Sequence, residues 1–336
     1  MFSEKANQII ASATKDKPHI KFTVGVYRGG ETVLKQYDAT GEIPYESHLY
    51  EIGSVGKVFT TSLLAKYLHE GKMNLNDSVA KYLPELDDGR YHPTLLRLAT
   101  HTAGYPTRYP LSKQELFHVA RKQIAAQLTK KPAKIDHLLR MNRDKMITLA
   151  KESNLRDKDY GWTYSNYGIS LLGHAIAAVA GQDFWDLMND FLAHDLGLSN
   201  SFMGTDSRNL LKGYSWSNEP LENWRGGRED YLAPAGSITS CAEDLLAFAK
   251  RHIENDPAYL ALTHVRYDMK SKHSDMGLGW WIDYKNPNML YHSGMTEGFC
   301  ATLAFDRQKK AAVVLLANVI YYKGQDKLFA EILNHL

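Results

Sequence analysis

The chain lacks the features that mark several large classes of protein. Its 336 residues include only two cysteines, Cys241 and Cys300, which suit neither a disulfide framework nor a metal-ligand spacing. No His-Glu-x-x-His or paired-Cys pattern occurs, so we expect no metal and no cofactor. The net charge is only +2 at pH 7, which gives no reason to expect nucleic acid as a partner.

Long apolar runs are also absent. No stretch reaches the about 20 apolar residues of a transmembrane helix, so no transmembrane segment is expected. The start, Met1-Phe2-Ser3-Glu4-Lys5, has no basic region followed by an apolar one, so no signal peptide is visible. The expected location is cytoplasmic if Met1 is the native start, and exported if a leader was removed; both remain open.

Strand patterns lie near the two ends of the chain. Apolar and polar residues alternate from Ile20 to Val26, which predicts a strand with one buried face, and Gly29-Gly30 predicts a hairpin turn. Late in the chain, short apolar runs at 289–292, 300–305 and 311–317 predict further strands. Helical periodicity dominates from about residue 54 to 205, with helices expected at 3–16, 113–129, 134–152 and 327–336.

This distribution predicts an α+β fold: an antiparallel sheet built from both termini, flanked by helices, with an inserted all-helical subdomain. We expect a single unit over 1–336, in which 1–80 and 205–336 form the sheet subdomain and 81–204 the helical one. A basic stretch at 121–145 has two interpretations. We favour a solvated helix face over a rim that attracts anionic substrates.

The stretch from Glu51 to Phe59 runs from a loop into a helix and carries Ser54 and Lys57. A helix start favours negative charge, and a lysine three residues later lies one turn on, near the serine. This arrangement is one way to build an acylating nucleophile. Ser-x-x-Lys alone is weak evidence, because the chain contains it two more times, at Ser12/Lys15 and Ser78/Lys81. We interpret Ser78 as a helix cap.

Two further motifs follow Ser54 in order. Tyr164-Ser165-Asn166 is one of two Tyr-x-Asn sequences, the other lying at Tyr284, whereas His292-Ser293-Gly294 is unique in the chain. With the stretches Leu98–Pro106 and Pro234–Asp244, these motifs resemble the serine β-lactamase-like superfamily, specifically its class C β-lactamases, D-Ala-D-Ala carboxypeptidases and family VIII esterases. The resemblance covers about residues 20 to 320 and implies the β-lactamase/transpeptidase-like fold.

The resemblance also implies roles for individual residues. Ser54 would be acylated, Lys57 and Tyr164 would share the proton transfers, and either could be the base. Asn166 would bind the substrate amide and orient Lys57. His292, Ser293, Gly294 and Met295 would bind substrate, with the backbone N–H groups of Ser54 and Met295 forming an oxyanion hole. The stretch around His101 is structural in this resemblance, so we leave His101 out of the site.

The residue type at position 292 helps to choose between β-lactamase activity and other hydrolase activities. Lysine, its counterpart in β-lactamases, carries a fixed charge that can hold a substrate carboxylate, whereas histidine, with a usual pKa near 6.5, is mostly neutral at pH 7. We therefore predict a serine hydrolase acting on a D-amino-acid peptide or a related amide or ester, with β-lactams as covalent ligands. The alternatives are a small-ester or D-alanyl esterase, and a slow-acylating β-lactam sensor or weak class C β-lactamase.

Overall fold

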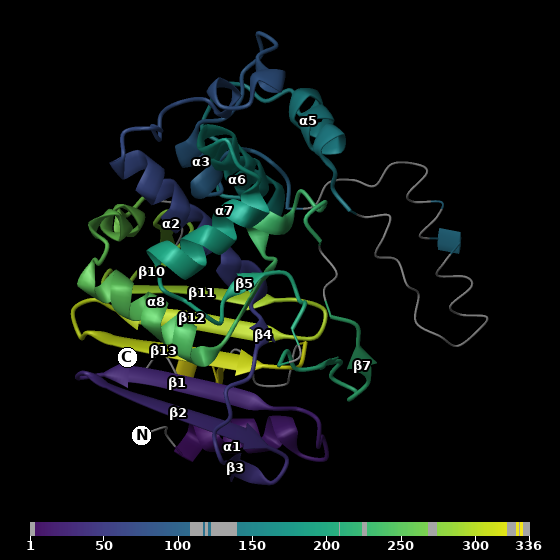
Figure 1. Cartoon of the computed structure of the whole chain (residues 1–336), viewed down its shortest axis with the longest axis vertical. Coiled ribbons are helices and arrows are strands. Elements are labelled where there is room, and N and C mark those ends of the chain that lie inside the picture. Colours follow the sequence, from purple (N-terminus) through teal and green to yellow (C-terminus); the bar gives the residue numbers. More distant parts are fainter. Residues whose placement is uncertain are drawn as a thin grey trace.

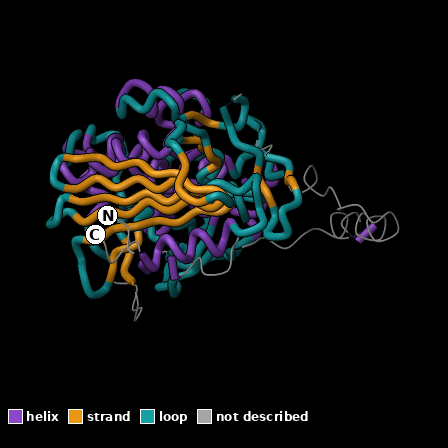
Figure 2. The backbone as a smooth tube through the Cα atoms, turned by 90° about the horizontal axis from the view of Figure 1, so that it is seen from below, coloured by secondary structure: helices purple, strands orange, loops and turns teal. Residues whose placement is uncertain are grey.

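An eight-stranded antiparallel sheet lies at the centre of the computed structural model, with helices on either side of it (Figures 1 and 2). The structure describes residues 4–107, 140–207, 209–223, 227–267 and 274–320, with isolated positions between 117 and 121 and between 327 and 331. The strand order is β3-β2-β1-β13-β12-β11-β10-β9. The strands are β1 (Phe22–Arg28), β2 (Glu31–Asp38), β3 (Gly41–Ile43), β9 (Ser274–Met276), β10 (Trp281–Asp283), β11 (Met289–Met295), β12 (Cys300–Asp306) and β13 (Ala311–Ala317).

The first and last strands of the sheet are neighbours, as predicted. Phe22 of β1 lies opposite Ala317 of β13, and Arg28 lies opposite Ala311. Gly29 and Gly30 close the β1–β2 hairpin with φ angles of 62° and 89°, the positive values that a tight hairpin turn requires. The antiparallel sheet built from both termini is therefore confirmed.

The central strands are buried on both faces. In β13, Ala311, Val313 and Leu315 belong to a small core with α1 (Glu4–Thr14). The alternate residues Ala312, Val314 and Leu316 belong to the main core, which includes α8 (Ala242–Glu254). The expectation that the first strand has only one buried face was wrong. Thr23 of β1 is as buried as its neighbours, so both faces of this strand are covered there. Helices cover both sides of the sheet, so its central strands read as continuous apolar runs.

Most helices lie between β3 and β9 in the chain. They are α2 (Gly56–His69), α3 (Leu95–Ala99), α5 (Arg143–Glu152), α6 (Asn166–Ala180), α7 (Phe184–Asp190) and α8. Helix α2 is buried around its whole circumference from Gly56 to Ala65, rather than along one apolar face. Helix α8 was not predicted. The helix expected at 134–152 is present in its described part as α5, which begins only at Arg143, while 134–139 fall outside the described residues. Most residues of the helices expected at 113–129 and 327–336 also fall outside them.

Short strands complete the fold. A three-stranded sheet contains β4 (Tyr50–Glu51), β8 (Ile238–Ser240) and β5 (Phe202–Met203), and a separate pair contains β6 (Gly213–Tyr214) and β7 (Pro220–Leu221). Strand β4 leads directly to the serine motif. No helix in the described part of the chain is long and apolar enough to cross a membrane. The division into subdomains at 80 and 205 stays a prediction.

Candidate active site

Ser54 lies in a single turn of 3-10 helix, Gly53–Val55, immediately before α2. Two glycines bring this turn against β11. A side chain at Gly53 would place its Cβ 2.7 Å from the carbonyl oxygen of Met295, and one at Gly294 would place it 2.0 Å from that of Ile52. Both distances are too short for a real Cβ, so glycine is required at these positions. The close approach puts the backbones of Ser54 and Met295, the two residues predicted to form the oxyanion hole, side by side.

Lys57 is completely buried on the first turn of α2. Its Nζ lies 2.9 Å from Ser54 Oγ and donates a 2.7 Å hydrogen bond to the carbonyl oxygen of Ala235. Burial lowers the pKa of this amine from 10.5 to about 7, because an apolar surrounding disfavours the charged form. A lysine in this state exchanges a proton near neutral pH. The role of Ala235 was not predicted, since a backbone contact leaves no residue-type signal.

Tyr164 approaches Ser54 from the loop before α6. Burial raises the pKa of its phenol to about 12, although the neighbouring Ser54 hydroxyl lowers it. Lys57 Nζ lies 4.9 Å from the centre of the Tyr164 ring. The structure therefore brings Ser54, Lys57 and Tyr164 together, with a phenol that stays protonated beside a lysine amine that titrates near pH 7.

The other copies of the serine motif are built differently. Ser78 Oγ accepts a hydrogen bond from the backbone N–H of Ala80, as expected of a helix cap. Lys81 is exposed to solvent and pairs with Asp77. Burial of the lysine thus distinguishes the Ser54 copy.

A cavity of about 140 Å³ opens beside Ser54. It is lined by Gly53, Ser54, Asn166, Leu232, Ala235, Gly236, Ser237, Met295 and Thr296. Asn166 Oδ1 and Thr296 Oγ1 are buried without a hydrogen-bond partner. Asn166 therefore faces the cavity. The hydrogen bonds that orient Lys57 go to Ser54 and Ala235 rather than to Asn166. Thr296 was missed from the sequence, where a threonine after the unique motif carries no distinguishing pattern.

His292 is buried on β11 and does not line this cavity. Its Nδ1 donates a 2.7 Å hydrogen bond to the carbonyl oxygen of Ser293, while its Nε2 has no partner. Burial, with a further contribution from Lys57, lowers the pKa of His292 to about 3. The ordinary value used in the sequence analysis was therefore too high, because the sequence does not reveal which face of a strand is covered. Ser293, the next residue, points to the exposed side.

His101, which the sequence analysis set aside, contacts Tyr164. The two ring centres lie 4.6 Å apart, and His101 is 1% exposed. Within the described residues, no group of three His, Cys, Asp or Glu side chains is arranged to hold a metal ion.

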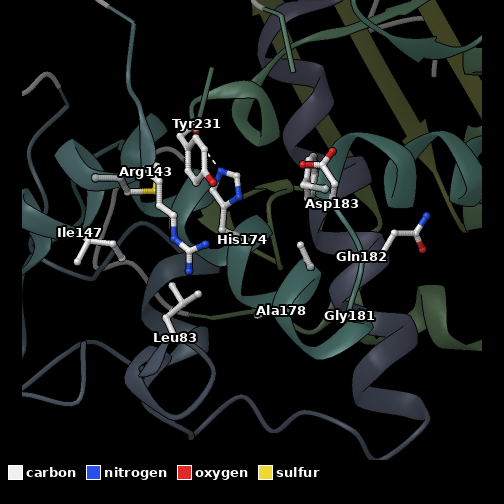
Figure 3. Close-up of a pocket in the computed structure, with 12 residues that line it drawn as sticks. Leu83, Arg143, Ile147, His174, Ala178, Gly181, Gln182, Asp183 and Tyr231 are labelled. Carbon is white, nitrogen blue, oxygen red and sulfur yellow. Dashed lines mark hydrogen bonds between the residues drawn. The ribbon is translucent and has the colours of Figure 1, made fainter. Parts of the chain in front are cut away.

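A larger cavity, of about 340 Å³, lies on the far side of α6 and contains none of the predicted site residues. Figure 3 shows Arg143, His174 and Tyr231 on one side of it and Gly181 and Gln182 on the other. His174 Nε2 donates to the carbonyl oxygen of Tyr231 at 3.0 Å, and Arg143 pairs with Glu85. These polar groups are already partnered, so the smaller cavity beside Ser54 is the better candidate for chemistry.

Comparison with known proteins agrees with this geometry. The family model described as Beta-lactamase matches residues 7–334. The chain belongs to the Beta-lactamase family. Its members are serine hydrolases, so the predicted membership of the serine β-lactamase-like superfamily and the predicted β-lactamase/transpeptidase-like fold are confirmed.

Individual members of the Beta-lactamase family resemble the chain along most of its length. A β-lactamase from Pseudomonas fluorescens is 27% identical over 321 residues, which cover 82% of this chain and 81% of the relative. A class C β-lactamase solved in complex with cefoxitin has a TM-score of 0.79 at 22% identity, covering 99% of this chain and 98% of that one. A β-lactamase/D-alanine carboxypeptidase from Pseudomonas syringae has a TM-score of 0.76, also at 22% identity, covering 99% and 98%. The structural matches show a shared fold.

Proposed function

We propose that this chain is a serine hydrolase that forms an acyl-enzyme on Ser54 and acts on a D-amino-acid peptide or a related amide or ester. The observation that carries the proposal is the buried Lys57 amine, which lies 2.9 Å from Ser54 Oγ and has a pKa of about 7. A serine hydroxyl is a weak nucleophile until a nearby base removes its proton. Lys57 meets the requirements of such a base in both distance and pKa.

The two proton-transfer groups take different roles in this mechanism. Above about pH 7 the neutral Lys57 amine accepts the Ser54 proton while Ser54 Oγ bonds to the substrate carbonyl carbon. The resulting oxyanion is placed against the backbone N–H groups of Ser54 and Met295. Tyr164, whose pKa of about 12 keeps it protonated, gives its proton to the leaving group and regains one from Lys57. Water then attacks the acyl-enzyme by the reverse transfers, which releases the acid product and restores Ser54.

The lining of the cavity supports a substrate with hydrogen-bond donors near the scissile bond. Asn166 Oδ1 is a buried acceptor without a partner, and a substrate amide N–H would satisfy it. Thr296 Oγ1, also buried and without a partner, can donate or accept. A substrate with an amide group therefore matches Asn166 and Thr296 better than a substrate that is apolar near the scissile bond.

A second candidate activity, hydrolysis of small neutral esters, is favoured by the state of His292. This imidazole is buried and neutral, and no charged side chain is among the described residues that line the cavity. A substrate carboxylate would thus find no fixed positive charge there. Comparing hydrolysis of a p-nitrophenyl ester with that of a D-Ala-D-Ala peptide separates the two activities.

The proposal predicts a covalent adduct on Ser54. Treatment with a fluorophosphonate or a β-lactam should add one reagent mass, which peptide mapping should place on Ser54. With the fluorophosphonate, the labelling rate should fall about tenfold per pH unit below pH 7 and level off above it, because only neutral Lys57 accepts the proton. Absence of an adduct with both reagents, together with unchanged activity in Ser54→Ala, would refute the proposal. A β-lactam adduct that never turns over, in a protein that hydrolyses neither the ester nor the peptide, would indicate a slow-acylating sensor instead.

The buried state of His292 predicts that substrate affinity does not respond to histidine protonation. Between pH 6 and pH 8, the KM for a substrate bearing a carboxylate, divided by the KM for a matched neutral ester, should follow the same course in the wild type and in His292→Asn. The reason is that a group with a pKa of about 3 remains neutral throughout this range, so any change in the ratio comes from Lys57, whose pKa is about 7. A decrease of the ratio below pH 6.5 in the wild type that is absent from His292→Asn would show that His292 becomes charged and holds the carboxylate.

A further inference from the structure

His101 has an unusual backbone conformation for its residue type. Its φ angle is +59°, in the left-handed region that most side chains avoid. Such a conformation persists only where the surrounding structure holds it, and it is concentrated at functional sites. His101 follows α3, and its side chain is turned inward and buried.

His101 accepts two hydrogen bonds, from the residue before Tyr164 and from the residue after it. The carbonyl oxygen of His101 accepts a 2.9 Å bond from the backbone N–H of Thr163, and its Nδ1 accepts a 3.1 Å bond from the backbone N–H of Ser165. One residue therefore holds the chain immediately before and immediately after Tyr164. The left-handed backbone of His101 presents its carbonyl and its ring to the same short segment.

The ring of His101 also packs against the ring of Tyr164. The two ring planes are inclined by 39°, with centres 4.6 Å apart, and Trp162 contacts His101 edge-on at 6.3 Å. Because Nδ1 accepts a hydrogen bond, the neutral imidazole carries its proton on Nε2. Burial, followed by the effects of Lys57 and His292, keeps the pKa of His101 well below its usual value, so this tautomer is maintained at neutral pH.

We propose that His101 is a positioning residue, which fixes the backbone on both sides of Tyr164 and thereby holds the phenol against Ser54. The inference rests on the proposed function, since it concerns the proton donor of that reaction. Tyr164 precedes α6, whose first turn is capped by Ser165: the side chain of Ser165 accepts a hydrogen bond from the Gly168 N–H and donates one to the carbonyl oxygen of Pro106, so both bonds hold the chain only on the C-terminal side of Tyr164. The bonds to His101 constrain the residues on either side of the phenol.

The test compares His101→Leu with His101→Asn. Leucine has similar bulk but no acceptor, whereas asparagine can accept the Ser165 N–H bond through Oδ1 and tolerates a left-handed backbone. His101→Leu should lower kcat for a chromogenic ester about 100-fold, with KM changed less than threefold, because a misplaced catalytic group slows the chemistry. His101→Asn should stay within about fivefold of the wild-type kcat.

A double-variant comparison separates positioning of Tyr164 from a general structural role. In a Tyr164→Phe background, His101→Leu should reduce kcat by less than twofold, because the group that it positions is gone. An equal 100-fold loss in both backgrounds would overturn the inference, as would a His101→Asn variant as slow as His101→Leu. If His101→Leu does not fold, imidazole nitrogen NMR of the wild type decides: protonation of Nδ1 at pH 7 would overturn the inference.

Failure of the positioning role of His101 can be distinguished from failure of the proposed hydrolase activity. If the wild type forms no adduct on Ser54, the proposed hydrolase activity fails. If the wild type is labelled and folded His101→Leu is labelled equally fast and turns over equally fast, only the positioning role fails.

Discussion

Replacing Lys57 with methionine should lower kcat/KM by about 10²–10⁴-fold, the usual contribution of a general base, and should also stabilise the protein. Activity is lost because methionine accepts no proton from Ser54. Stability rises because the amine is fully buried: shifting its pKa from 10.5 to about 7 corresponds to about 5 kcal/mol of destabilisation at pH 7. This destabilisation grows as the pH falls from 10.5 to 7, since the unfolded chain binds the proton more tightly.

The net gain in stability is smaller than the full shift. The carbonyl oxygen of Ala235 loses its partner in Lys57→Met, which costs about 1–3 kcal/mol. We therefore expect an increase of about 2–4 kcal/mol in the free energy of unfolding, measured by urea denaturation at pH 7. Lys81→Met, in the exposed copy of the motif, is the matched control and should change neither activity nor stability by much. A Lys57→Met enzyme of near-normal activity would contradict the assignment of the base.

Mild acid should unfold the protein near pH 5. Four histidines in the described part of the chain are buried with lowered pKa values: His101, His252, His264 and His292. In the unfolded chain these side chains protonate near pH 6.5, whereas in the folded protein burial keeps them neutral. Stability is thus fully present above about pH 6.5 and is lost as the pH falls below it. At pH 5 each histidine costs about 2 kcal/mol, and four together approach the total stability of a typical domain.

The histidine pair in the main core provides the sharpest test. His252 Nδ1 and His264 Nε2 lie 2.8 Å apart, so protonating both removes the acceptor of their hydrogen bond and places two like charges in contact. His264→Gln, which does not titrate, should move the acid midpoint to lower pH, as measured by circular dichroism. His194→Gln, at an exposed position, should leave the midpoint unchanged. A wild-type midpoint below pH 4 would indicate that protonation of carboxylates governs acid unfolding.

Two buried carboxyl groups act in the opposite direction. Burial raises the pKa values of Asp230 and Asp244, so the folded state takes up their protons at higher pH than the unfolded chain does. Their contribution to stability therefore increases as the pH falls. Because hydrogen bonds counteract burial at both sites, we expect the four histidines to dominate the result.

The sheet and the serine motif could be predicted because their signals are local. Alternation from Ile20 onward and the apolar run at 311–317 depend on the residues themselves, and the Ser54 copy of Ser-x-x-Lys is distinguished by the short motifs at Tyr164 and His292 that follow it in order. The state of Lys57 is different. Its lowered pKa arises from complete burial, which depends on the segment around Ala235, 178 residues away in the sequence.

The histidines show why the rest of the site could not be predicted. His292 lies on a strand whose pattern allows either face to be covered, and only the packing of the helices decides its pKa. His101 acts through a left-handed backbone and an imidazole nitrogen that meets Ser165, neither of which has a sequence pattern. Helix α8 is an exception, since Leu245, Leu246 and Ala249 have the spacing of a helix face.

The close packing of Gly53 against Met295 has a consequence for how the protein is made on the ribosome. Ser54 is synthesised well before residue 295, where the strand that supports it ends. Strand β1 likewise cannot pair with β13 until residues 311–317 have been made. A nascent chain that stops before these strands holds the proposed nucleophile without the backbone that would activate it. Synthesis order would therefore delay the proposed chemistry until strands β11 and β13 have emerged.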